Sequence, residues 1–138
     1  MILFDTDICV EILRGNRSLV EQRRAYHEVV AVSFMTVAEL YYGVYKSSSV
    51  NSNKSVVEEF FASVAVIESD AQIAQRFGAI KATLTRCGAT VTDADLLIAA
   101  TSMERCIFLV TGNVRHFQMI DGLEMRNWRL SDGGDDLQ

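Results

Sequence analysis

Residues 2–7 read Ile-Leu-Phe-Asp-Thr-Asp, a short apolar run that stops at an acid. Three more apolar runs of similar length follow along the chain, at 29–32 (Val-Val-Ala-Val), 64–67 (Val-Ala-Val-Ile) and 107–110 (Ile-Phe-Leu-Val). Short runs that are apolar throughout are typical of strands buried on both faces, as in a parallel sheet.

Longer segments with helical periodicity separate these runs. We expect helices at about 7–13, 18–26, 34–46, 55–62, 71–86 and 93–105. Alternation of strands and helices predicts an α/β fold, with a central parallel sheet flanked by helices and right-handed crossovers. The Ser- and Asn-rich stretch 47–53 is interpreted as a loop between two helices. Residues 1–130 are expected to form one domain, and 131–138 an acidic flexible tail.

Composition restricts the classes of function. The net charge of −5 argues against strong binding to bulk nucleic acid, although an acidic site that binds divalent cations inverts its local charge. No run of 18 apolar residues exists, so no membrane span is expected, and the N-terminus lacks the features of a signal peptide. Three widely spaced cysteines, Cys9, Cys87 and Cys106, are expected to be buried thiols, which favours a cytoplasmic protein.

Polar residues follow the predicted strands at the edge where a parallel α/β sheet binds its ligands. Asp5 closes the first strand, where burial would be costly unless the acid is paired or bound to metal. The other candidates come from three later segments, and they are Glu39, Asp93, Asp95, Thr111 and Asn113. Neither Cys nor His accompanies them, and an all-oxygen set selects Mg²⁺ or Mn²⁺.

Most of these residues also have a structural explanation. Asp7 is well placed to cap the helix that follows it. Thr92 and Asp95 have the spacing of a capping box, and this explanation is as good as metal binding. Asp93 and Asp95 are two residues apart at a helix start, so we do not expect both to face one ion.

Glu39 also has both a structural and a functional explanation. It lies opposite an expected apolar stripe, where a solvated glutamate would also lie; the stripe comprises Phe34, Val37, Ala38, Tyr41 and Val44. Thr36 and Gly43 share its face, and such small residues favour a cleft wall. His27 and His116 are expected to be unrelated surface residues.

Taken together, the sequence resembles the PIN domain family, specifically the VapC-type ribonuclease toxins of type II toxin–antitoxin systems. Blocks in family order carry the resemblance, namely 3–7, 33–43, 88–100 and 109–117, with 122–124 and 127–128 closing the match. Asp7 departs from the family pattern, which usually has Asn at this position.

The resemblance implies a PIN-like three-layer sandwich with an acidic pocket at the carboxyl edge of its sheet. It implies catalytic and metal-binding roles for Asp5, Glu39 and Asp95. Supporting roles fall on Thr6, Asp93, Thr111 and Asn113. The implied activity is Mg²⁺-dependent hydrolysis of RNA, with Mn²⁺ as a substitute.

The resemblance also implies partners. They are an RNA substrate, a second copy of the chain, and a small cognate antitoxin. The clustered acids would repel one another without metal, so we expect the antitoxin to insert a basic side chain into the acidic pocket.

Two rival interpretations remain open at this stage. One is a haloacid-dehalogenase-like phosphatase, with Asp5 as covalent nucleophile and Asp7 as general acid. It leaves Glu39 and the Thr-Gly-Asn turn at 111–113 unexplained, and no lysine lies convincingly before its late acidic motif. The other is a PIN-like scaffold that binds RNA or protein without cutting, against which the intact set Asp5, Glu39 and Asp95 argues.

Overall fold

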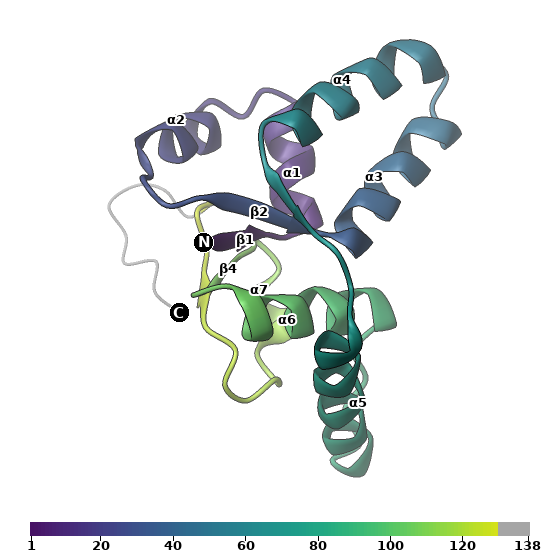
Figure 1. Ribbon diagram of the computed structural model, residues 1–138, viewed down its shortest axis with the longest axis vertical. Helices are drawn as coiled ribbons and strands as arrows, with labels where there is room; N and C mark the ends of the chain where they lie inside the picture. Colours follow the sequence, from purple (N-terminus) through teal and green to yellow (C-terminus); the bar gives the residue numbers. More distant parts are fainter. Residues whose placement is uncertain (130–138) are drawn as a thin grey trace.

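A five-stranded, all-parallel sheet forms the centre of the computed structural model, which describes residues 1–129 (Figure 1). The strands are β1 (Ile2–Phe4), β2 (Val30–Ser33), β3 (Ala65–Ile67), β4 (Leu109–Val110) and β5 (Met125–Arg126), in the spatial order β3-β2-β1-β4-β5. In the register, Leu3 of β1 lies between Ala31 of β2 and Leu109 of β4. The α/β class with a parallel sheet is confirmed.

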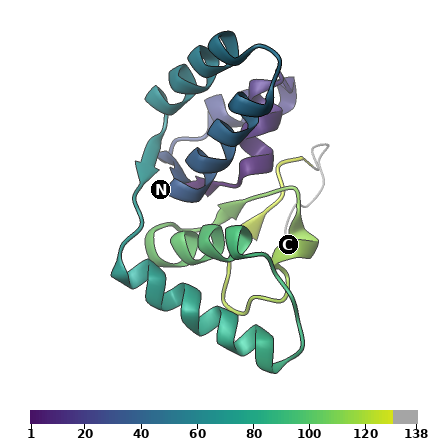
Figure 2. The same ribbon diagram turned by 90° about the vertical axis from the view of Figure 1, so that its right-hand side faces the viewer.

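Helices cover both faces of this sheet. They are α1 (Thr6–Leu13), α2 (Arg17–Ala25), α3 (Phe34–Lys46), α4 (Val50–Ala62), α5 (Ala71–Arg86), α6 (Asp93–Arg105) and α7 (Val114–Phe117). The helices α1 to α4 lie on one side, and α5 to α7 lie on the other (Figures 1 and 2). This arrangement is the three-layer sandwich that the resemblance implies.

Side-chain alternation along β1 explains the two layers. Ile2 and Phe4 pack into one apolar core with residues of α1 to α4, whereas Leu3 packs into a second core with residues of α5 and α6. All three side chains are fully buried. An apolar residue at every position is therefore what a central strand between two layers requires.

The predicted elements differ most from the structure at α4 and at two short elements that were not predicted. Helix α4 begins at Val50 rather than at 55, so the loop before it spans only 47–49. Ser and Asn are weak helix formers, but Val57 and Phe60 anchor α4 in the core, and that packing overrides propensity. The short elements α7 and β5 were not predicted, because neither contains enough residues to show a period.

The buried face of α3 also differs from the prediction. Thr36, Leu40 and Val44 are buried, while Phe34 is 51% exposed and Ala38 is exposed. Ser33 caps the start of α3, since its hydroxyl accepts the Thr36 N–H at 3.1 Å, and the Thr36 hydroxyl lies 2.9 Å from the Thr6 hydroxyl. This face of α3 therefore carries one hydroxyl group, that of Thr36, into the interior.

The remaining expectations concern cysteines, membranes and the tail. All three cysteines are free thiols, but only Cys9 is buried, and the expectation was wrong for Cys87, which is exposed. No helix within residues 1–129 has the length and apolar character to cross a membrane. The predicted acidic tail, 131–138, lies outside the described residues.

Candidate active site

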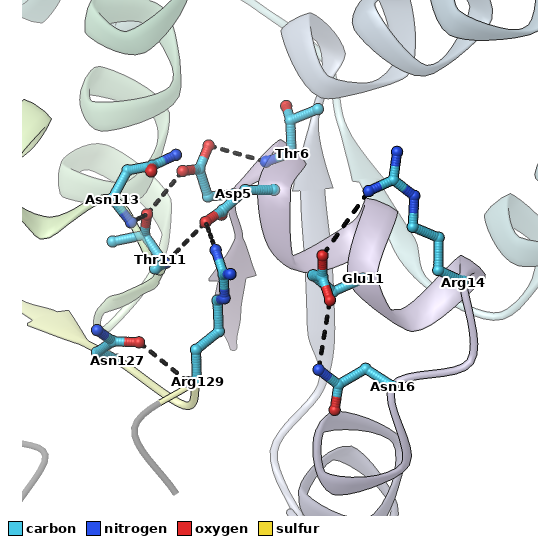
Figure 3. Close-up of polar contacts among 11 residues, drawn as sticks. Asp5, Thr6, Glu11, Arg14, Asn16, Thr111, Asn113, Asn127 and Arg129 are labelled. Carbon is cyan, nitrogen blue, oxygen red and sulfur yellow. Dashed lines mark hydrogen bonds and ion pairs between the residues drawn. The ribbon is translucent and has the colours of Figure 1, made fainter.

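Asp5 occupies the carboxyl end of β1, and its side chain is 3% exposed. One carboxylate oxygen accepts the N–H of Thr6 at 2.8 Å. The other accepts the hydroxyl proton of Thr111 at 2.7 Å, from the residue that follows β4. Figure 3 shows Asp5 between Thr6 and Thr111. The prediction that this acid closes a buried strand is confirmed.

Burial and a second acid make Asp5 difficult to ionise. The pKa of its carboxyl is raised from 3.8 to about 8, first by burial and then by the nearby charge of Asp7. The hydrogen bonds from Thr111 and Thr6 lower the pKa, but they do not offset burial. An acid in this position favours either a proton or a neighbouring cation.

Asp7 is the neighbour that the sequence did not identify as part of the site. The N-cap of α1 is Asp5, because the helix begins at Thr6, so the prediction that Asp7 caps it was wrong. The Oδ2 atom of Asp7 instead accepts the N–H of Gly112 at 2.9 Å, and Arg129 Nη1 lies 3.6 Å from the same oxygen. The Oδ1 atom is buried and has no hydrogen-bond partner within residues 1–129.

A row of hydroxyl groups connects the end of β1 to Glu39. The Thr6 hydroxyl donates to Glu39 Oε1 at 2.7 Å and lies 2.9 Å from the Thr36 hydroxyl. Because the Thr6 hydroxyl has one proton and gives it to Glu39, Thr36 donates to Thr6. Glu39 is thus held at the edge of the sheet through Thr6.

Asp95 lies in the first turn of α6. The Thr92 hydroxyl accepts its N–H at 3.2 Å, so the predicted cap at Thr92 is confirmed. The carboxylate of Asp95 lies 3.3 Å from His116 Nδ1, a contact that the sequence analysis did not foresee. His116 belongs to α7, which packs against α6 and was not predicted.

Asp93 and Asn113 are the two remaining candidates, and their surroundings differ. Asp93 is 65% exposed and forms an ion pair with Lys81 of α5 at 2.8 Å. The backbone N–H of Asn113 donates to the Thr111 hydroxyl at 2.9 Å, so the turn at 111–113 is tied to Asp5 through Thr111. Asn113 thus lies beside the site, while Asp93 is engaged with α5.

The donor chemistry partly fits a hard divalent cation. Asp5 and Asp7 are adjacent, and the unpartnered Oδ1 of Asp7 is an oxygen that a cation would satisfy. Within residues 1–129, however, no group of three or more Asp, Glu, His or Cys side chains is close enough together to hold a metal. Glu39 and Asp95 would have to approach Asp5 to complete such a group.

Comparison with known proteins resolves the family. The model of the PIN domain matches residues 2–123, which is most of the chain. The chain belongs to the PIN domain family. Among PIN domains, this chain is of the VapC type, because relatives of that type align with it over almost its whole length.

Two relatives of this PIN domain are similar over almost their whole length. The tRNA(fMet)-specific endonuclease VapC of Shigella flexneri is 32% identical over 127 residues, which cover 91% of this chain and 96% of that protein. Ribonuclease VapC2 of Haemophilus influenzae is also 32% identical, with the same coverage.

Solved structures show the same likeness. One is VapBC2 from Rickettsia felis bound to a DNA fragment from its promoter, with a TM-score of 0.86, 31% identity, and coverage of 93% of this chain and 99% of that chain. Another is DNA-bound VapBC from Salmonella typhimurium, with a TM-score of 0.88, 31% identity, and coverage of 92% and 97%. With the PIN family shown, the phosphatase alternative, which was built on residues 2–7 with Asp93 and Asp95, is not favoured.

Proposed function

We propose that this PIN domain is a Mg²⁺-dependent endoribonuclease that acts as the toxin of a toxin–antitoxin pair in the cytoplasm. Hydrolysis of RNA is supported by relatives that are named ribonucleases and align over almost the whole chain. Dependence on metal is supported by one observation in particular, the buried Asp5 beside the half-buried Asp7 with its unpartnered oxygen.

Asp5 and Asp95 are the residues that would hold the cation, and Glu39 would complete its shell or position the attacking water. Mn²⁺ is the expected substitute. When bound, the cation would lower the pKa of a water molecule and offset the charge that develops on the phosphate. Asn113 would contribute at most an amide oxygen, which adds no charge to a second metal position.

The chain's own residues then have defined tasks. Thr111 and the Thr6 N–H keep the Asp5 carboxylate fixed at the end of β1. Thr6 keeps Glu39 aimed at the same edge, where a water molecule would attack the phosphorus. The bond from phosphorus to the 3′ oxygen breaks, that oxygen takes a proton, and the products are a 5′-phosphate and a 3′-hydroxyl.

A protein partner would regulate the activity. The VapBC structures that resemble this chain are toxin–antitoxin complexes, which supports a cognate antitoxin. We propose that the antitoxin inserts an Arg or Lys beside Asp5 and Asp7, where a positive charge would relieve the repulsion between the two acids. We also propose that the chain works as a homodimer.

The test uses the purified chain and a defined RNA, incubated with EDTA, Mg²⁺ or Mn²⁺. We expect cleavage only with a divalent cation, and products with 5′-phosphates. The variant Asp5→Asn should remove cleavage, while the matched control Asp121→Asn, at an exposed position, should leave it unchanged. Cleavage in EDTA would refute metal dependence, and RNA binding without cleavage under any condition would favour the non-catalytic scaffold.

A further inference from the structure

Arg129 lies over the acidic site. Its guanidinium Nη1 is 3.6 Å from Asp7 Oδ2, and its side chain is 45% exposed. The two residues come from opposite ends of the described chain, since Asp7 is in the first turn of α1 and Arg129 follows β5. In Figure 3, Arg129 extends from beside Asn127, and the dashed line from its guanidinium marks the ion pair with Asp7.

Gly112 makes this approach possible. A Cβ atom at position 112 would collide with the Cδ of Arg129, and it would lie 2.9 Å from Arg129 Nη1 and 2.8 Å from Asp7 Oδ2. The side chain of Arg129 therefore lies against bare backbone, with the Gly112 N–H donating to the same carboxylate. Three segments of the chain meet at Asp7.

Arg129 pairs with only one of the two oxygens of the Asp7 carboxylate. It lies beside Oδ2, whereas Oδ1 remains buried without a hydrogen-bond partner within residues 1–129. A divalent cation held by Asp5, beside Asp7, would thus be opposed by a guanidinium that is always charged. Two cations beside the same pair of acids repel each other, so each opposes the binding of the other.

We infer that Arg129 is a built-in counter-cation that weakens the affinity of the site for divalent metal. The inference rests on the proposed function, because it concerns the metal site proposed there. In the metal-free protein Arg129 offsets the charge of Asp7, and metal binding requires the guanidinium to move away or tolerate the repulsion. The site is thereby adjusted to bind metal less tightly than its acids alone would.

The experiment measures Mn²⁺ binding by calorimetry, with no RNA present. The variant Arg129→Gln keeps most of the side chain over Gly112 but removes its charge. We expect it to bind Mn²⁺ about fivefold more tightly than the unchanged chain, the size of effect given by a partly exposed ion pair. The difference should shrink at high salt, because partly exposed charges are screened.

A matched control removes a different arginine from a similar pair. Arg14 lies 3.9 Å from Glu11, on the other side of Thr6 from Asp5 in Figure 3, and Arg14→Gln should leave the Mn²⁺ affinity unchanged. A second test uses Asp7→Asn, in which Arg129 has lost its charged partner. In the Asp7→Asn variant, the further change Arg129→Gln should alter the affinity for Mn²⁺ less than it does in the chain that keeps Asp7.

The outcomes separate the inference from the proposed function. Mn²⁺ binding that is lost in Asp5→Asn but equal, or weaker, in Arg129→Gln would overturn the role of Arg129 and leave the metal site standing. Absence of any binding that depends on Asp5 would overturn the metal site itself, and the inference with it. An equal gain in Arg14→Gln would show a general charge effect and would also overturn the inference.

Discussion

The hydroxyl of Thr111 donates to the carboxylate of Asp5 at 2.7 Å, although 106 positions separate the two residues in the sequence. They meet because β1 and β4 are neighbouring parallel strands, with Phe4 paired to Val110. Each residue directly follows its strand, so both lie at the carboxyl edge of the sheet. The candidate site is therefore a product of strand pairing, and its stability depends on the sheet.

The first prediction concerns stability in the absence of metal. The pKa of Asp5 is about 8 in the folded chain and 3.8 in its ordinary state, so between these values the unfolded chain has lost the proton and the folded chain has kept it. The free energy of unfolding should fall as pH rises from about 4 to 8, and it should then level off. The effect of this one group is on the order of a few kcal/mol.

Denaturant unfolding in EDTA at several pH values checks this prediction. Asp5→Asn cannot ionise, so its curve should lack this fall, and it should be the more stable protein at pH 8. Added Mg²⁺ should stabilise the unchanged chain at pH 8 but not the variant. Parallel pH profiles for the two proteins would contradict the burial argument.

A second prediction concerns Asp7. Asp7→Asn should keep RNA cleavage within about tenfold, because an amide oxygen can still accept the Gly112 N–H and the variant removes a charge that opposes ionisation of Asp5. In a phosphatase with Asp7 as general acid the same change would be crippling. Steady-state cleavage rates measure the effect, and an aspartyl-phosphate trapped on Asp5 would favour the phosphatase.

A third prediction concerns the connection from Thr6 to Glu39. Thr6→Ala removes the hydroxyl that donates to Glu39 at 2.7 Å, so cleavage should slow by about tenfold as Glu39 loses its orientation. Thr6→Ser keeps the hydroxyl and should restore most of the rate. If both variants cleave equally, Glu39 does not depend on Thr6.

A fourth prediction concerns Gly112. Gly112→Ala places a methyl group against Asp7 and Arg129, so it should lower the free energy of unfolding by on the order of 1–3 kcal/mol. The control Gly78→Ala adds a methyl group on α5 with nothing within 4 Å, and it should be neutral or stabilising. Thermal unfolding compares the two, and equal effects would show that the contact at Gly112 is tolerated.

A fifth prediction concerns the antitoxin. The purified complex should be inactive, and high Mg²⁺ should weaken the hold of the partner if its basic side chain competes for Asp5 and Asp7. Affinity measured across a Mg²⁺ titration tests this idea. Inhibition that survives replacement of every basic residue in the partner's buried tail by Ala would indicate that it blocks the RNA path instead.

The sequence predicted the parts of the site that depend on strands. Asp5 could be found because an acid that ends a buried apolar run is unusual, and Thr111 because it follows another such run. Both inferences needed only the direction of parallel strands, which is common to the whole sheet. The α/β class followed from the same four runs.

The parts of the site that were missed depend on the exact residue at which a helix begins, or on contacts between residues far apart in the sequence. Helix α1 begins at Thr6, one residue before the predicted start, and that shift moves the cap from Asp7 to Asp5. Arg129 reaches Asp7 from beyond β5, a two-residue strand without a recognisable pattern. The contact of His116 with Asp95 was missed for a similar reason, since α7 has only four residues.

The central position of β1 also bears on the synthesis of this protein. The ribosome makes β1 first, but the neighbouring strand β4 comes more than 100 residues later. This later strand includes Val110, whose carbonyl accepts the N–H of Asp5. A growing chain that has already made Asp5, Glu39 and Asp95 still lacks the strand that fixes the first of them. The site proposed to cut RNA therefore stays incomplete until the last strands of the sheet have been made.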